Sequence, residues 1–371
     1  MTRLRLGHLN GALLQSARES SGFSLEEIAR AANLKDTEAV LGLEAGEIRP
    51  TLSQAEGLAH KFQRPLAYFY LQSAPNASAS RIVDNRSPSR ATDFSPKTLL
   101  ALRRIHLVQS SASEIQALLG QPSPELPHIE RSWNIQDSAS VLRGWLGLDA
   151  SRNWLLRTVA LSRLIGNVER SGVSVLQLAM PTLELQGASS LDPYPVVLLN
   201  HSDYVSSKIF TLVHEVAHLA LRVGGLCVVD PAPTHEIERL CNRIAGETLV
   251  PRNDLDRAME SVRQLDDDSL RDLADRFSVS REVVLLRLIE LGKLPASEWD
   301  ACVPRWRSEA RMKSKGQPRT PAPASLAIRE NGQRFTSLVF SGETRGVISQ
   351  ADASRSLRIG IGVLEDLRQR R

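Results

Sequence analysis

Ile209-Phe210-Thr211-Leu212-Val213-His214-Glu215-Val216-Ala217-His218-Leu219-Ala220-Leu221 is an apolar run that contains two histidines and one glutamate. Its length and composition predict a buried helix. Residues four apart share a helix face, so the imidazoles of His214 and His218 can bind one metal ion. Glu215 lies beside that face, where it can activate water as a general base. The alternative is a set of hydrogen-bonded core residues, but burying three such polar groups without a metal is costly.

The third ligand decides which kind of metal site this is. Three protein ligands with an open position for water are typical of catalytic zinc, whereas four protein ligands make a closed structural site. A metzincin would continue with a glycine and a third histidine. Leu221 and Gly224 stand at those two places, so that class is excluded.

A second helix is predicted over residues 235–251, where apolar positions recur with helical spacing. The preceding segment 224–234 is long enough to turn the chain so that the two helices face each other. Glu238 stands twenty residues after the second histidine and is the preferred third ligand. His235 and Glu236 are rivals at the helix start, where capping or solvent-facing roles are equally open.

Together these segments resemble the ImmA/IrrE family of gluzincin-type zinc metallopeptidases. The resemblance rests on a strand ending in Asn200, on the segment 210–218 and on the helix 238–251. The chain has Cys241-Asn242 and Ile244-Ala245 where family members usually carry Ala-Asn and Phe-Ala. These are small and apolar substitutions.

The resemblance implies one zinc ion bound by His214, His218 and Glu238, with Glu215 activating water. It also implies a protein substrate, often a helix-turn-helix repressor cut at a specific site. Asn242, one turn after Glu238, is a candidate to support the histidine ligands from behind.

Amide hydrolysis also needs a donor for the developing oxyanion. Tyr204, Ser206 and Lys208 precede the histidines and are candidates, with Tyr204 placed first. A small sheet beside the helix is expected, because an edge strand can hold a substrate peptide by main-chain hydrogen bonds. The strands predicted at 172–178 and 196–200 are the candidates for that edge.

Composition is that of an ordinary globular protein, with 371 residues, 42% hydrophobic and 24% charged. This length predicts two or three domains. Apolar stretches of membrane-spanning length and a signal-peptide pattern are both lacking in the sequence. Three cysteines are too few for a disulfide framework. We therefore expect a cytoplasmic protein without a membrane partner.

Residues 1–72 are similar to an XRE-type helix-turn-helix domain, that is, a five-helix domain like that of lambda repressor. Ser24 and Glu27 form a predicted capping box before the second helix. The turn motifs Leu43-Glu44-x-Gly46 and Pro50-Thr51 follow the third helix. The resemblance covers about sixty residues and implies a fold, not a ligand.

DNA binding by this module stays open. The candidate contact residues at and after the third helix are Lys35, Thr37, Glu38 and Arg49. Residues 1–72 carry eight basic and eight acidic side chains, which weakens the phosphate attraction that drives most DNA affinity. The alternative is protein docking, through dimerisation or capture of a similar domain in a partner. The oligomeric state is open, with a dimer among the options.

The predicted fold class is mainly α with a small β-sheet (α+β), with the lambda-repressor-like domain followed by a zincin-like peptidase domain. A linker is predicted at 73–97, the peptidase domain at 98–303, a basic Pro-rich linker at 304–325 and a small helical appendage at 326–371. A helix pair at 265–291 is expected to pack beneath the catalytic helices, in preference to a role as a second DNA reader.

The predicted function is a zinc-dependent regulatory endopeptidase. Its substrate would be a partner protein, namely an XRE-type repressor, cleaved in response to stress or mobile-element induction. The alternative is a DNA-binding transcriptional regulator or antitoxin-like protein in which the metal site is structural or sensory.

Overall fold

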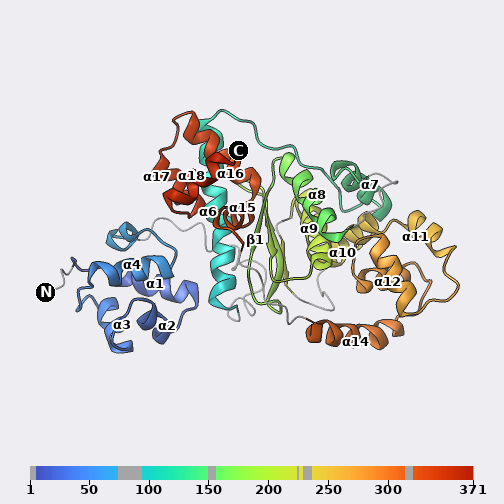
Figure 1. Ribbon diagram of the computed structural model, residues 1–371, viewed down its shortest axis with the longest axis horizontal. Helices are drawn as coiled ribbons and strands as arrows, with labels where there is room; N and C mark the ends of the chain where they lie inside the picture. The colour runs from blue at the N-terminus through green and yellow to red at the C-terminus, as the bar shows by residue number, and fades with distance from the viewer. Residues whose placement is uncertain are drawn as a thin grey trace. The chain divides into compact units, whose positions relative to one another are not determined.

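The computed structural model describes residues 6–73, 94–148, 156–223, 225–228, 236–313 and 321–370. This part of the chain is mainly helical with one small sheet, which confirms the α+β class (Figure 1). The chain divides into an N-terminal unit, Met1–His106, and a C-terminal unit, Leu107–Arg371. The boundary falls within α6 (Pro96–Leu118), and most of the linker predicted at 73–97 lies outside the described residues. No helix among the described residues has the length and apolar character needed to span a membrane.

The N-terminal unit contains a bundle of short helices around one apolar core. The core includes Leu14, Ile28, Leu43, Phe62 and Phe69, all almost completely buried. The helices are α1 (Gly11–Ser21), α2 (Leu25–Ala31), α3 (Thr37–Glu44), α4 (Leu52–Lys61) and the 3-10 helix η1 (Leu66–Tyr70).

Local sequence explains where these helices start. The predicted capping box is confirmed, because Ser24 and Glu27 bond reciprocally at the start of α2. Asp36 caps α3 by accepting the N–H of Ala39 at 2.9 Å. Arg18 on α1 holds Glu44 at the end of α3 by two hydrogen bonds of 2.7 and 3.1 Å. This pair fixes α3 against α1.

The C-terminal unit is built on a four-stranded sheet of order β1-β3-β2-β4. The strands are β1 (Ser174–Leu178), β2 (Leu185–Ser190), β3 (Val196–Asn200) and β4 (Gly225–Val228). β1 is parallel to β3, and β2 is antiparallel to both β3 and β4. The predicted strands at 172–178 and 196–200 are confirmed as β1 and β3.

Two strands of the sheet were not predicted. β2 has the sequence Leu-Gln-Gly-Ala-Ser-Ser, which lacks the β-branched and aromatic residues that mark strands. β4 lies in the segment 224–234, where the sequence predicts a connecting turn between two helices. Both strands form because β2 pairs with a neighbour on each side, so tertiary pairing outweighs weak local propensity.

Helix α9 (Val205–Ala220) carries the histidines and packs against β2 and β3. From Lys208 to Ala220, every residue except Phe210 is buried, which confirms the predicted buried helix. Helix α10 (Glu236–Leu249) lies alongside α9 (Figure 1). Two more helices, α7 (Ile135–Trp145) and α8 (Arg157–Arg170), pack against α10 and α9 respectively.

The next four helices extend the same core. They are α11 (Arg252–Met259), α12 (Asp267–Arg276), α13 (Arg281–Glu290) and α14 (Ser297–Lys313). Leu273 of α12, Val284 of α13 and Trp306 of α14 belong to the apolar cluster that also contains Val213 of α9. The prediction that the pair at 265–291 completes the peptidase core is therefore confirmed.

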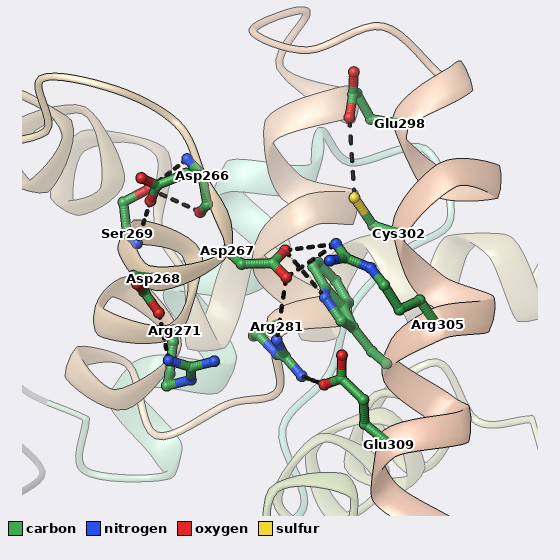
Figure 2. Close-up of polar contacts among 11 residues, drawn as sticks. Asp266, Asp267, Asp268, Ser269, Arg271, Arg281, Glu298, Cys302, Arg305 and Glu309 are labelled. Carbon is green, nitrogen blue, oxygen red and sulfur yellow. Dashed lines mark hydrogen bonds and ion pairs between the residues drawn. The ribbon is translucent and has the colours of Figure 1, made fainter.

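The linker predicted from residue 304 begins later than expected, because residues 304–313 are the second half of α14. Asp267 on α12 accepts hydrogen bonds from Arg305 at 2.9 Å and from the Trp306 indole at 3.2 Å (Figure 2). Arg281 on α13 lies over the Trp306 ring and pairs with Glu309 at 3.1 Å. These contacts hold a sequence rich in charge, and containing a proline, in a helix.

The C-terminal segment is helical, as predicted, and belongs to the same unit as the sheet. Its helices are α15 (Pro323–Asn331), α16 (Gln333–Thr344), α17 (Gln350–Leu357) and α18 (Ile361–Gln369). α15 and α16 pack against β1. The junction between them is Gly332, whose missing side chain leaves room for the Val175 backbone and the Glu169 carboxylate. The segment is thus part of the core fold rather than a separate appendage.

Candidate metal centre

Helices α9 and α10 bring three potential ligands together. The Nε2 atoms of His214 and His218 lie 3.0 Å apart. The carboxylate of Glu238 lies 3.2 Å from His214 Nε2 through Oε2 and 3.3 Å from His218 Nε2 through Oε1. His214 and His218 are one helical turn apart on α9, and Glu238 reaches them from the first turn of α10.

The chemistry of these donors fits a zinc ion. Tetrahedral ligands at about 2.0–2.2 Å from zinc lie roughly 3.3 Å from one another, close to the spacings seen here. The two imidazole nitrogens lie 3.0 Å apart with the carboxylate beside both, so a single cation can accept a lone pair from each of the three groups. Two His and one Glu are also the ligand set of a catalytic zinc with an open position.

Glu215 is fully buried between α9 and the sheet. Burial raises the pKa of its carboxyl, and the neighbouring Glu238 acts in the same direction, while the two histidines and the Ser189 hydroxyl oppose the shift. Neither carboxylate oxygen has a hydrogen-bond partner among the described residues. A buried carboxylate with unused acceptor capacity and a raised pKa is suited to accept a proton from water.

The pKa of the Glu238 carboxyl is lowered, in contrast to that of Glu215. Burial alone would raise its pKa, but hydrogen bonds from His214 and His218 outweigh burial and hold the pKa well below its usual range. Glu238 is therefore an anion in this arrangement, which is the form that binds a metal.

The rivals for the third ligand do not join this cluster. Glu236 is exposed at the start of α10 and takes no part in the group formed with the two histidines. His235 lies outside the described residues. Among the described residues, Asn242 makes no hydrogen bond to either imidazole. Its predicted role in supporting the histidine ligands therefore stays a prediction.

The predicted oxyanion donors lie at the start of α9. Tyr204 precedes the first turn, with 55% of its surface exposed. Lys208 is buried, and its ammonium donates to the carbonyl oxygen of His201 at 3.4 Å. Burial lowers the pKa of Lys208, while Asp203 opposes the shift. Ser206 is partly buried in the same turn. None of these contacts links the three candidates to the histidine pair.

Of the two strands expected to offer a substrate edge, only β1 lies at an edge of the sheet. β3 is an interior strand, paired on both sides. β1 is an edge strand, but the outward N–H of Val175 is bonded to Glu169 Oε1 at 3.4 Å, and α15 packs alongside. β4, at the opposite edge, is next to β2 and packs against α9. β4 is therefore the edge strand next to β2, and β2 is the strand that approaches Glu215.

The candidate contact residues of the N-terminal unit lie at its surface. Lys35 is highly exposed, with its ammonium 3.8 Å from Asp36. Thr37 begins α3, and Glu38 is exposed in its first turn. Arg49 donates a hydrogen bond to His8 Nε2 at 2.8 Å.

Fold and site together define a class of protein: an α+β domain in which a buried helix and a second helix present a His-His-Glu site beside a small sheet. Residues 168–288 match the peptidase family described as the IrrE N-terminal-like domain. The match extends from the end of α8 to α13 and contains the complete site. It supports the resemblance to the ImmA/IrrE family and indicates peptidase activity. No curated protein matches the chain.

Proposed function

We propose that this protein is a zinc-dependent endopeptidase that cleaves a partner protein. The observation that carries the proposal is the convergence of His214, His218 and Glu238 next to a buried Glu215 that has no hydrogen-bond partner among the described residues. The match to a peptidase family over the same residues supports it.

Each side chain has a distinct part in peptide hydrolysis. His214, His218 and Glu238 would hold the zinc ion. Bound zinc would supply Lewis acidity, lowering the pKa of water and polarising the scissile carbonyl. Glu215 accepts a proton from the attacking water and then gives it to the leaving amine. Burial assists the second step, because a carboxyl with a raised pKa is a better proton donor near neutral pH.

The substrate is held, in this proposal, as an extended peptide along β4. An edge strand offers unpaired N–H and C=O groups to a peptide main chain. β4 is favoured over β1 because the edge of β1 is occupied by Glu169 and by the C-terminal helices.

The central test compares wild type with Glu215→Gln for metal content and for cleavage. The variant keeps all three ligands, so one zinc ion per chain is expected to remain, while cleavage falls by about 100-fold or more through loss of the general base. Glu236→Gln, at an exposed position outside the cluster, is the matched control and should behave as wild type. Cleavage by Glu215→Gln at the wild-type rate would show that Glu215 is not the base.

The substrate we propose is an XRE-type repressor, and the N-terminal unit is the module that brings the enzyme to that repressor or to DNA. The proposal for this module is supported by its short helices, α1 to α4 and η1, which pack around one apolar core. A repressor encoded next to this protein is the first substrate to assay. A gel shift on DNA upstream of the gene tests DNA docking, with Lys35→Ala and Thr37→Ala as the variants expected to weaken it.

A transcriptional regulator with a structural or sensory metal is the second candidate function. It draws support from the N-terminal unit and from the positions of Lys35, which is exposed, and Thr37, which is partly exposed. Zinc-loaded wild-type protein that shifts operator DNA, yet leaves the repressor intact, would favour this function over the peptidase.

A further inference from the structure

Strand β2 meets the helix α9 at a residue without a side chain. A methyl group at Gly187 would lie 3.2 Å from Glu215 Oε1 and 3.1 Å from the carbonyl oxygen of Leu198. The same methyl would overlap the Cγ2 atom of Thr211, well inside van der Waals contact. At the present depth of α9 on the sheet, only glycine fits at this position.

The residues around this contact belong to two matching faces. Thr211 and Glu215 are one turn apart on α9 and both face the sheet. Gly187 and Ser189 are two residues apart on β2 and therefore share the strand face that meets α9. The helix can approach the strand because this face carries only a hydrogen atom and a small hydroxymethyl group.

The strand is also irregular at this point. The pairing of β2 with β4 shifts register between Leu185 and Gly187. Such bulges bend a strand locally and change the direction of neighbouring groups, and glycine is common at them. The irregularity and the missing side chain thus coincide at the residue that faces Glu215.

We propose that Gly187 is a positioning residue, which leaves room for the Glu215 side chain to hold its carboxylate in its present position beside the His214–His218 pair. The inference rests on the proposed function, in which Glu215 is the general base. Catalytic groups displaced by about 1 Å lose roughly 100-fold in rate. A methyl group at position 187 would overlap the Thr211 methyl group and press on the Glu215 carboxylate, and its three nearest neighbours include no metal ligand.

The test is Gly187→Ala in the full-length chain, alone and combined with Thr211→Ser. The serine keeps the hydroxyl and removes the methyl group that would overlap. We expect Gly187→Ala to retain one zinc ion, to change KM by less than about threefold and to lose roughly 100-fold in kcat. Thr211→Ser alone is the matched control and should keep wild-type kcat. Wild-type kcat in zinc-loaded Gly187→Ala would overturn the inference.

The unfolding midpoint supplies a readout that does not depend on cleavage. If the added methyl meets the carboxylate, Glu215→Ala should restore part of the midpoint lost in Gly187→Ala, so that the two effects are not additive. Additive effects would overturn the contact. If Gly187→Ala alone does not fold, the same comparison is made in the Thr211→Ser background. A wild-type protein that cleaves nothing defeats the proposed function, whereas the unfolding comparison still decides the contact.

Discussion

Glu238 on α10 places its Oε2 atom 3.2 Å from Nε2 of His214 on α9. The strand β4 lies between these two helices in the chain and pairs at the edge of the sheet. The distance between Glu238 and His214 therefore depends on how the C-terminal unit folds as a whole. The metal-binding capacity of the site depends on it, because the two histidines alone give two ligands on one helix face.

Replacing Glu238 by Ala should therefore weaken zinc binding much more than replacing a residue outside the cluster. Loss of a residue that merely supports a ligand costs about 10–100-fold in metal affinity, so loss of a ligand should exceed about 100-fold. Competition with a chromophoric chelator measures the affinity. Glu236→Ala, two residues earlier in the same helical turn, is the control and should bind zinc normally. Equal affinities in the two variants would remove Glu238 from the ligand set.

Gly332→Ala is expected to loosen the C-terminal helices from β1. Gly332 has φ +75, and a methyl group there would lie 2.7 Å from Glu169 Oε1 and 2.9 Å from the Val175 carbonyl oxygen. With ψ 148 as well, this backbone conformation is populated almost only by glycine, so alanine should cost about 1–3 kcal/mol in strain, and the clash should add about 1–3 kcal/mol more.

Gly346→Ala separates the two contributions. Gly346 has φ +72 and open space around the added methyl, so it carries only the backbone cost. Denaturant unfolding of both variants gives the difference. If Gly346→Ala destabilises the protein as much as Gly332→Ala, the close approach of Glu169 and Val175 to Gly332 does not contribute to the loss of stability.

Glu169 should make stability depend on pH. Burial raises the pKa of its carboxyl to about 7, although backbone N–H groups of Arg334, Val175 and Gln333 oppose the shift. The folded chain therefore keeps a proton that the unfolded chain releases at about 4.5. Its contribution is fully present below about pH 4.5 and is lost as the pH rises to about 7. The loss is at most about 3 kcal/mol, since one pKa unit is worth about 1.4 kcal/mol.

Glu169→Gln removes this titration while retaining an amide oxygen that can accept the N–H groups. The free energy of unfolding should consequently fall less steeply with pH in the variant than in wild type over that window. If the free energy of unfolding depends on pH in the same way in both proteins, Glu169 is not the group that titrates. Every other titrating group is present in both proteins and cannot produce a difference between them.

Arg287 on α13 and Glu247 on α10 form a buried ion pair, with Arg287 also donating to the Val250 carbonyl oxygen at 3.3 Å. Arg287→Met leaves Glu247 buried without its cation, which should cost about 3–5 kcal/mol. Replacing both residues by Met should recover most of that loss, because the buried Glu247 carboxylate is removed as well, and Glu290, which pairs with Arg287 at 2.6 Å, is partly exposed to water. Denaturant unfolding of the single and double variants checks this. A double variant no more stable than the single one would show that the apolar surroundings cannot accept the exchange.

The sequence predicts the local parts of the site well. His214, Glu215 and His218 are related by helical spacing alone, and the apolar run around them leaves little choice but a buried helix. Glu238 is less local, yet the periodicity of its own helix places it facing inward. By contrast, β2 carries no strand signal in Leu-Gln-Gly-Ala-Ser-Ser, and the role of Gly187 becomes visible only once α9 lies on that strand.

The same contrast explains the wrong expectations. Residues 304–313 were interpreted as a linker from their charge and proline, but Asp267, Arg281 and Glu282 neutralise or hold that charge and favour a helix. The sequence predicts only two of the four strands, β1 and β3, and the strand order of a sheet cannot be deduced when half of its strands are unknown.

By itself, the sequence predicted the candidate donors, the helix that carries the first two of them and the α+β class, since these depend on residue type and on periodicities of a few residues. The tertiary structure decided which strands lie at the edges of the sheet, how deeply Glu215 is buried and why glycine faces it. Those properties arise from contacts between segments far apart in the chain, and short-range sequence patterns cannot predict such contacts.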